Sequence, residues 1–112
     1  MFAPWIGPQP KVSRFVVHRR DDEVVLALSG EIDIASMNEL ERQLDAVAFS
    51  LPAKVVVDFA ELEFIDGRGA AAVAAMAGAL PAFGTAVVLR SPRAAVRRVF
   101  DLVGVGSLTI EP

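Results

Sequence analysis

The chain contains no cysteine and no tyrosine, and His18 is its only histidine among 112 residues. The absence of cysteine excludes disulfides, thiolate nucleophiles and cysteine metal sites. His18 lies in a β-rich run with no second metal-ligand type nearby, which favours a structural or surface role. A basic excess is also lacking, because 11 Lys and Arg face 14 Asp and Glu for a net charge of -3. This balance argues against direct binding of nucleic acid.

Long hydrophobic runs are equally scarce. The longest apolar stretch, residues 69–84, is interrupted by Pro81 and is shorter than the roughly 18 residues of a membrane-spanning helix. The first residues, MFAPWIGPQPK, show no basic segment followed by an apolar one, as a signal peptide would. We therefore expect a cytoplasmic protein without membrane insertion.

What is present indicates one folded unit. Hydrophobic residues make up 54% of the chain and charged residues 22%, a composition typical of globular domains. We expect residues 1–12 to be a Pro-rich N-terminal tail and residues 13–112 to be a single domain. Docking of the tail through Phe2, Trp5 or Ile6 and a loosely ordered tail are both open.

The hydrophobic periodicity predicts alternating strands and helices. A hairpin is expected first, then a helix that Pro52 ends, and later a helix that Ser91 caps with Pro92 at its first position, with Gly104 or Gly106 after its end. The predicted strands are 14–20, 24–30, 54–59, 85–90 and 107–110, and the predicted helices are 37–51, 70–80 and 91–103. The order β-β-α-β-α-β-α-β implies an α/β fold, a small mixed β-sheet flanked by α-helices.

The segment FIDGRGAAA, residues 64–72, resembles a dinucleotide-binding glycine turn. Two observations argue against that function. The preceding strand is expected to end near Phe59, with residues 60–64 as a loop, and no Asp or Glu follows Asp66 until Asp101 to bind a ribose. A G-x-x-x-x-G-K-[ST] phosphate loop is absent from the sequence as well.

Asp66 and Arg68 behave differently at the start of the predicted helix. Asp66 can cap the free N–H groups of the first turn, and its charge suits the positive end of the helix dipole. Arg68 has the opposite charge and opposes the same dipole. Disagreement between local preference and residue choice is typical of functional sites.

Other charged groups have simpler explanations. Asp58, Glu61, Glu63 and Asp66 are the carboxylates that could hold magnesium or calcium, but they show no specific loop pattern, and a polar loop with one helix cap accounts for them. Arg90, Arg93, Arg97 and Arg98 indicate either a solvated helix face or a contact for an acidic partner. No pattern typical of nucleophilic catalysis is found, so we expect neither an enzyme nor a metal or cofactor.

Three segments together resemble the STAS domain of the anti-sigma factor antagonist (anti-anti-sigma factor) family. They are LSGEIDIAS at 28–36, KVVVDFAELEFIDGRGAAAV at 54–73 and VVLRSPRAAVRRVFDLVGV at 87–105. The resemblance covers about residues 14–110. It implies a regulatory protein that binds an anti-sigma factor of the serine-kinase type and so frees a sigma factor for transcription.

In that family the turn usually reads Asp-Ser-x-Gly, and the serine is the phosphorylation site. The resemblance places Asp66 at the motif aspartate, Gly69 at the motif glycine and Arg68 at the variable position. Gly67 stands where the serine is expected, so the switch residue is missing. Asp33 matches the acidic residue after the second strand, near the same surface. These five residues form the predicted partner-binding site.

Two alternatives stay open within the same fold. The chain could be a STAS sensor or accessory domain that binds a nucleotide or another anion at Arg68 and the helix N-terminus, including as a subunit of a transport or signalling complex. A homodimer through unpaired strand edges is the other open state. Ser29, Ser36 and Ser91 lie outside the motif, and the last two are expected to be helix-associated.

Overall fold

The computed structural model describes residues 12–104 and 108–112. Phe2, Trp5, Ile6 and Gly106, which carried predictions about the tail and the end of the last helix, lie outside the described residues. The strands are β1 (Arg14–Arg20), β2 (Glu23–Ile32), β3 (Lys54–Ile65), β4 (Ala86–Arg90) and β5 (Thr109–Glu111). The helices are α1 (Met37–Phe49), α2 (Gly67–Ala79) and α3 (Ala94–Val103), with 3-10 turns η1 (Ile34–Ser36) and η2 (Leu80–Phe83). The predicted element order is confirmed.

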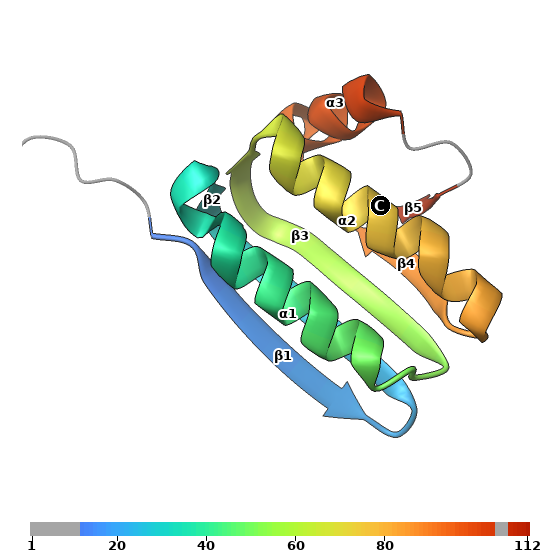
Figure 1. Cartoon of the computed structure of the whole chain (residues 1–112). Coiled ribbons are helices and arrows are strands. Elements are labelled where there is room, and N and C mark those ends of the chain that lie inside the picture. The colour runs from blue at the N-terminus through green and yellow to red at the C-terminus, as the bar shows by residue number, and fades with distance from the viewer. Residues whose placement is uncertain (1–11, 105–107) are drawn as a thin grey trace, which may run out of the picture.

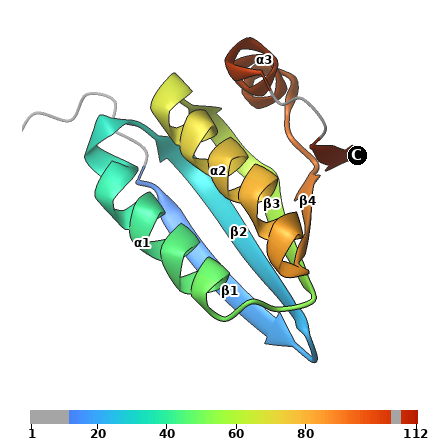
Figure 2. The ribbon, with the colours of Figure 1, turned by 45° about the vertical axis from the view of Figure 1, so that its right-hand side comes forward.

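The strands form one sheet in the order β1-β2-β3-β4-β5. β1 and β2 are an antiparallel hairpin, whereas β2, β3, β4 and β5 run parallel. Figures 1 and 2 show α1 lying over β1 and β2. On the same face of the sheet, α2 lies next to α1, and α3 lies next to α2. Since each parallel neighbour is reached through a helix, the carboxyl ends of β2 and β3 meet at one edge, where α1 and α2 begin.

The core lies between the sheet and the three helices. Leu40, Leu44 and Val47 of α1 are buried, as the predicted amphipathic stripe requires. From α3, Phe100 meets Phe59 of β3 edge-to-face, with ring centroids 5.3 Å apart. Alternate strand residues face this core, so that Val55 and Val57 belong to it while Val56 points to the helix-free face.

The predicted loop over residues 60–64 is wrong, because β3 continues to Ile65. The register between β2 and β3 shifts twice. The first shift lies between the pairs Ala27–Asp58 and Ser29–Glu61, and the second between the pairs Gly30–Leu62 and Glu31–Phe64. At each shift β3 carries one extra residue, as in a β-bulge. The two irregularities break the alternation of buried and exposed residues, and the strand therefore resembled a loop in the sequence.

The predicted cap of the last helix is also wrong. Ser91 has φ +58 and its N–H donates to the Glu111 carbonyl, while α3 begins three residues later with Arg93 in the cap position. The chain passes the end of β5 before it can turn into a helix. Leu51, predicted as part of the first helix stripe, lies beyond the end of α1 and is exposed. Gly104 ends α3 at φ +81, as expected.

Candidate functional site

The candidate site is the turn region where β2 and β3 end side by side. Ile32 and Ile65 are paired neighbours at the ends of these strands. The N–H of Asp66 donates to the Ile32 carbonyl at 3.0 Å, which joins the two strand ends just before both chains leave the sheet. Asp33 and Asp66 consequently start neighbouring loops, although 33 positions separate them in sequence.

Asp66 caps α2 as predicted. Its backbone is extended, at φ -83 and ψ 173, and its Oδ1 accepts from the Gly69 N–H at 2.9 Å. Its carbonyl accepts from the Ala70 N–H, which begins the helix. The carboxylate therefore occupies the position where an anionic ligand of this helix terminus would bind.

The two glycines of the turn have different structural roles. A Cβ built on Gly69 would lie 2.8 Å from Ile65 Cγ1 and 3.2 Å from Ile32 Cγ2, so only glycine lets α2 approach the strand ends this closely. A Cβ built on Gly67 meets nothing within 4 Å. Gly67 is exposed, in ordinary helical conformation, and a larger side chain fits there without strain.

The loop after β2 is held by Asp33. Its Oδ1 accepts from the Ala35 N–H at 3.0 Å and from the Ser36 hydroxyl at 3.3 Å, and it caps η1. Ser36 is buried by this arrangement. Asp33 itself stays exposed, on the same edge of the sheet as the Asp66 turn.

Arg68 is exposed in the first turn of α2, and within residues 12–104 and 108–112 it forms no ion pair. Its guanidinium is therefore available to a partner. The structure brings all five predicted residues to this edge: Gly67, Arg68 and Asp33 are exposed, Asp66 is partly buried, and Gly69 is buried against the isoleucines.

Two apolar residues of this edge were not predicted as site residues. Ile34 in η1 is 69% exposed and Phe64 near the end of β3 is 43% exposed. Ile34 directly follows Asp33, and Phe64 precedes the turn by one residue. The missed signal is that both lie between a predicted strand and a predicted helix, where exposed apolar side chains often mark a contact surface.

Two arginines of the predicted basic cluster pair with two of the predicted carboxylates. Arg90 binds Asp58 at 3.0 Å. Arg93 donates to the Ala60 carbonyl at 3.1 Å and lies 3.8 Å from Glu61. These contacts satisfy polar groups at the irregular part of β3, so the arginines stabilise the strand that carries the site. The exposed Arg93 and Arg97 agree with a solvated helix face, whereas Arg90 is held by the partly buried Asp58.

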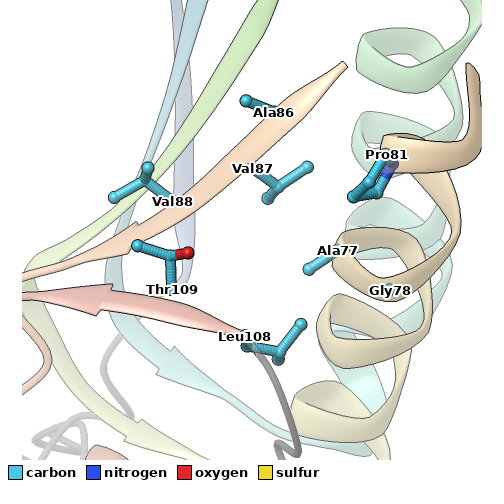
Figure 3. A pocket seen from close by; sticks show the side chains of 8 residues that line it. All are labelled: Ala77, Gly78, Pro81, Ala86, Val87, Val88, Leu108 and Thr109. Carbon is cyan, nitrogen blue, oxygen red and sulfur yellow. The ribbon is translucent and has the colours of Figure 1, made fainter. Parts of the chain in front are cut away.

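A cavity of about 350 Å³ lies beside α2, away from the turn. Figure 3 shows Ala77 of α2, Val87 of β4 and Leu108 pointing into it from three sides. Among the described residues that line it, Thr109 supplies the only hydroxyl, and none carries an acid, a base or another nucleophile. This cavity gives no support to a catalytic site.

Within the described ranges, 12–104 and 108–112, no group of three or more His, Asp or Glu side chains is placed to hold a metal ion. None of the helices in the same part of the chain is long and apolar enough to cross a bilayer.

Comparison with known proteins places this geometry in context. A family model described as "Mlab, STAS domain" matches residues 15–110. No curated protein matches the sequence significantly. A solved anti-sigma factor antagonist from Mycobacterium paratuberculosis is 27% identical, with a TM-score of 0.82, over 90% of this chain and 86% of that one.

Two further solved structures share the fold. The anti-sigma factor antagonist SpoIIAA in its unphosphorylated form is 24% identical, with a TM-score of 0.74, over 88% of each chain. A putative anti-sigma factor antagonist from Thermotoga maritima is 20% identical, with a TM-score of 0.77, over 88% of this chain and 86% of that one.

Proposed function

The chain belongs to the STAS domain family, and from that premise we propose that it is a non-enzymatic regulatory protein that binds an anti-sigma factor. Its structure is similar to those of anti-sigma factor antagonists. The observation that carries the proposal is the exposed edge formed by Asp33, Ile34, Phe64 and Arg68 around the Asp66 cap. We name these residues, with Gly67, the turn surface. A cytoplasmic location and a single domain over residues 13–112 are parts of the proposal.

The turn surface has the composition of a protein-binding patch. Ile34 and Phe64 offer exposed apolar area, and full burial of such side chains contributes about 1.5–3 kcal/mol each. Asp33 and Arg68 add exposed groups of opposite charge, which favour one orientation of a partner. The exposed side of α2 continues the surface beyond Arg68.

We also propose that the usual serine switch is missing. A phosphoserine would add about -1.5 to -2 charges at the N-terminus of α2 beside Asp66. Gly67 has no hydroxyl to accept it, and the buried Ser36 is engaged with Asp33. In this proposal, phosphorylation at position 67 does not control binding of the partner.

A gain-of-function variant tests this point. The space around Gly67 accommodates Gly67→Ser, so incubation with a cognate anti-sigma kinase should add one phosphate to the variant and none to position 67 of the natural chain. Intact-mass measurement followed by peptide mapping decides. A phosphate on Ser29, Ser36 or Ser91 of the natural chain would contradict the missing switch.

Binding of a nucleotide or another anion at the turn is the second candidate function. The exposed Arg68 favours it, but the Asp66 carboxylate already occupies the helix terminus and repels an anion. We therefore expect flat calorimetric titrations with GTP, ATP and phosphate. Saturable heat that Arg68→Glu abolishes would instead favour the sensor function.

The proposed function is tested by binding of purified anti-sigma factors to the full chain. Asp66→Asn removes the charge while asparagine still caps a helix, and Arg68→Glu reverses the exposed cation. Both should weaken the complex, whereas Arg20→Glu, which makes the same charge reversal at the hairpin turn between β1 and β2, should not. Binding that is indifferent to both turn variants would refute the proposed surface.

A further inference from the structure

A groove runs between α1 and α2, away from the turn surface. Two hollows of about 330 and 420 Å³ share Asp45, Ala48 and Leu80, so they form one continuous depression along both helices. We name it the α1–α2 groove. The hollow of about 330 Å³ is its upper part, which Leu44 and Met76 also line, and the hollow of about 420 Å³ is its lower part. Along α2 the groove extends from Ala72, one helical turn from Arg68, to Ala79, which is about 18 Å from Gly67 at 1.5 Å per residue.

The lower end of the groove is strongly apolar and open to solvent. Phe49 is 91% exposed and Phe83 is 68% exposed, and both line the lower hollow with Leu51. Contiguous apolar surface of this kind marks an interaction site more often than scattered single residues do. The exposed phenyl rings are suitable anchors for a partner.

The walls of the groove differ in charge. The α2 side carries no charged side chain between Gly69 and Leu80. The α1 side contributes Glu41 and Asp45, both exposed. Neither forms an ion pair within the described ranges, 12–104 and 108–112. The rim is therefore acidic and uncompensated.

The cationic side chain of α1, Arg42, already forms an ion pair with Glu39. A hydrogen bond from the Gln43 side chain, with the charge of Arg42, lowers the pKa of Glu39, so that Glu39 is a carboxylate at neutral pH. Arg42 therefore neutralises Glu39 and leaves the acidic rim without a counter-charge.

The shape of the groove suits a helix. From Glu41 to Phe49 it extends about 12 Å along α1, or a little over two helical turns. The small side chains Ala72, Ala75 and Ala79 along α2 allow a third helix to approach closely. An amphipathic helix laid into an apolar groove is a recurrent mode of peptide recognition.

We propose that the α1–α2 groove docks an amphipathic helix of a partner protein, with apolar side chains on Met76, Leu80 and Phe83 and Lys or Arg residues beside Glu41 and Asp45. The groove shares no residue with the turn surface, although Ala72 in the groove lies one helical turn from Arg68, and the proposal does not depend on which partner binds the turn. Charge favours this occupant over two others. A second copy would bring two acidic rims together, and residues 1–11 contain a single basic side chain, Lys11, next to Val12.

The test uses a synthetic helix rather than an unidentified partner. The probe is a fluorescein-labelled peptide of about 14 residues, long enough to form a helix on binding, with Leu at i, i+3, i+4 and i+7 spacing and Lys elsewhere. A matched peptide carries Glu in place of Lys. Fluorescence anisotropy should show saturable binding of the Lys peptide to the full chain and at least tenfold weaker binding of the Glu peptide. Absence of saturable binding would overturn the proposal.

Paired variants separate docking in the groove from general attraction to an acidic protein. Ala75→Glu places a carboxylate inside the groove, and Ala71→Glu places one on the exposed side of α2 outside it. Both make the protein equally more acidic. Ala75→Glu should weaken binding of the Lys peptide at least fivefold, while Ala71→Glu leaves it equal or stronger. Equal effects of the two substitutions would overturn the proposal.

The charge of the rim is tested in the same assay. Asp45→Lys should weaken the Lys peptide about fivefold, as expected for losing and reversing one exposed charge contact. Glu31→Lys, with the same change in net charge on the other face of the sheet, should change binding less than twofold. Circular dichroism and urea unfolding confirm that each variant is folded.

Two measurements exclude the other occupants. Trp5 is the only tryptophan and tyrosine is absent, so intrinsic emission at 295 nm excitation reports on the N-terminal segment alone. Its emission, and the sedimentation of the chain, should be the same in Ala75→Glu and the natural protein. A Trp5 blue shift that Ala75→Glu reverses would assign the groove to residues 1–11. A dimer that Ala75→Glu dissociates would assign it to a second copy, and either result overturns the proposal.

Discussion

Substituting the two glycines of the turn separately should change stability in opposite directions. Gly67→Ala places a methyl group in open space at the start of α2, so the gain in helix propensity should stabilise the protein by about 0.5–1 kcal/mol. Gly69→Ala forces the same methyl group to within 2.8 Å of Ile65 Cγ1. Overpacking of this kind typically costs about 1–3 kcal/mol, which exceeds the propensity gain.

The two variants should therefore differ by about 1–3 kcal/mol, with Gly69→Ala the less stable. Urea unfolding followed by circular dichroism measures this from the midpoints, provided that the m-values stay equal. Thermal midpoints should separate in the same order, by about 4–8 °C per kcal/mol for a domain of this size. Equal stabilisation by both alanines would refute the close approach of α2 to Ile32 and Ile65.

Three further experiments test contacts at the site and elsewhere in the fold. Asp66→Ala should cost about 1 kcal/mol through loss of the α2 cap, whereas Asp66→Asn should cost a few tenths, both by urea unfolding. Thr85→Val removes the buried 2.6 Å hydrogen bond from Thr85 Oγ1 to the Pro52 carbonyl and should cost about 1–3 kcal/mol, so an unchanged midpoint would contradict that bond. A double-mutant cycle on Asp58 and Arg90 should give less than about 1 kcal/mol, because both side chains are partly exposed.

The order of elements could be read from the sequence because local signals agreed with the final fold. The stripe at Leu40, Leu44 and Val47 and the apolar run from Val55 to Val57 each kept its period in the structure. The Asp66 cap was equally local, since it needs only the three residues that follow it. Family resemblance added the expected position of the phosphorylatable side chain.

The errors came from contacts between distant segments. The end of β3 was missed because its bulges depend on pairing with β2, which no local period records. Ser91 was predicted to be a helix cap, but its N–H donates to the carbonyl of Glu111 at the end of β5. A loop between β3 and the glycine turn was one of the arguments against a dinucleotide site, and it no longer holds because β3 continues to Ile65. The missing acidic residue after Asp66 and the Asp66 cap still argue against such a site.

Only some residues of the turn surface could be predicted, because the others reach it through contacts between distant segments. Asp33 and Asp66 carried a polar signal that could be matched to a motif, whereas Ile34 and Phe64 become neighbours of the turn only after the parallel pairing of β2 and β3. The α1–α2 groove depends on the packing of two helices and had no counterpart in the sequence.

The most direct test of the proposed function is the equilibrium affinity of the full chain for a purified anti-sigma factor from the same organism. We expect a specific complex that Asp66→Asn and Arg68→Glu each weaken about tenfold, or about 1.4 kcal/mol, and that Arg20→Glu leaves unchanged. Failure of every such factor to bind, or a complex that is as stable with both turn variants as with the natural chain, would contradict the assignment of the turn surface to partner binding.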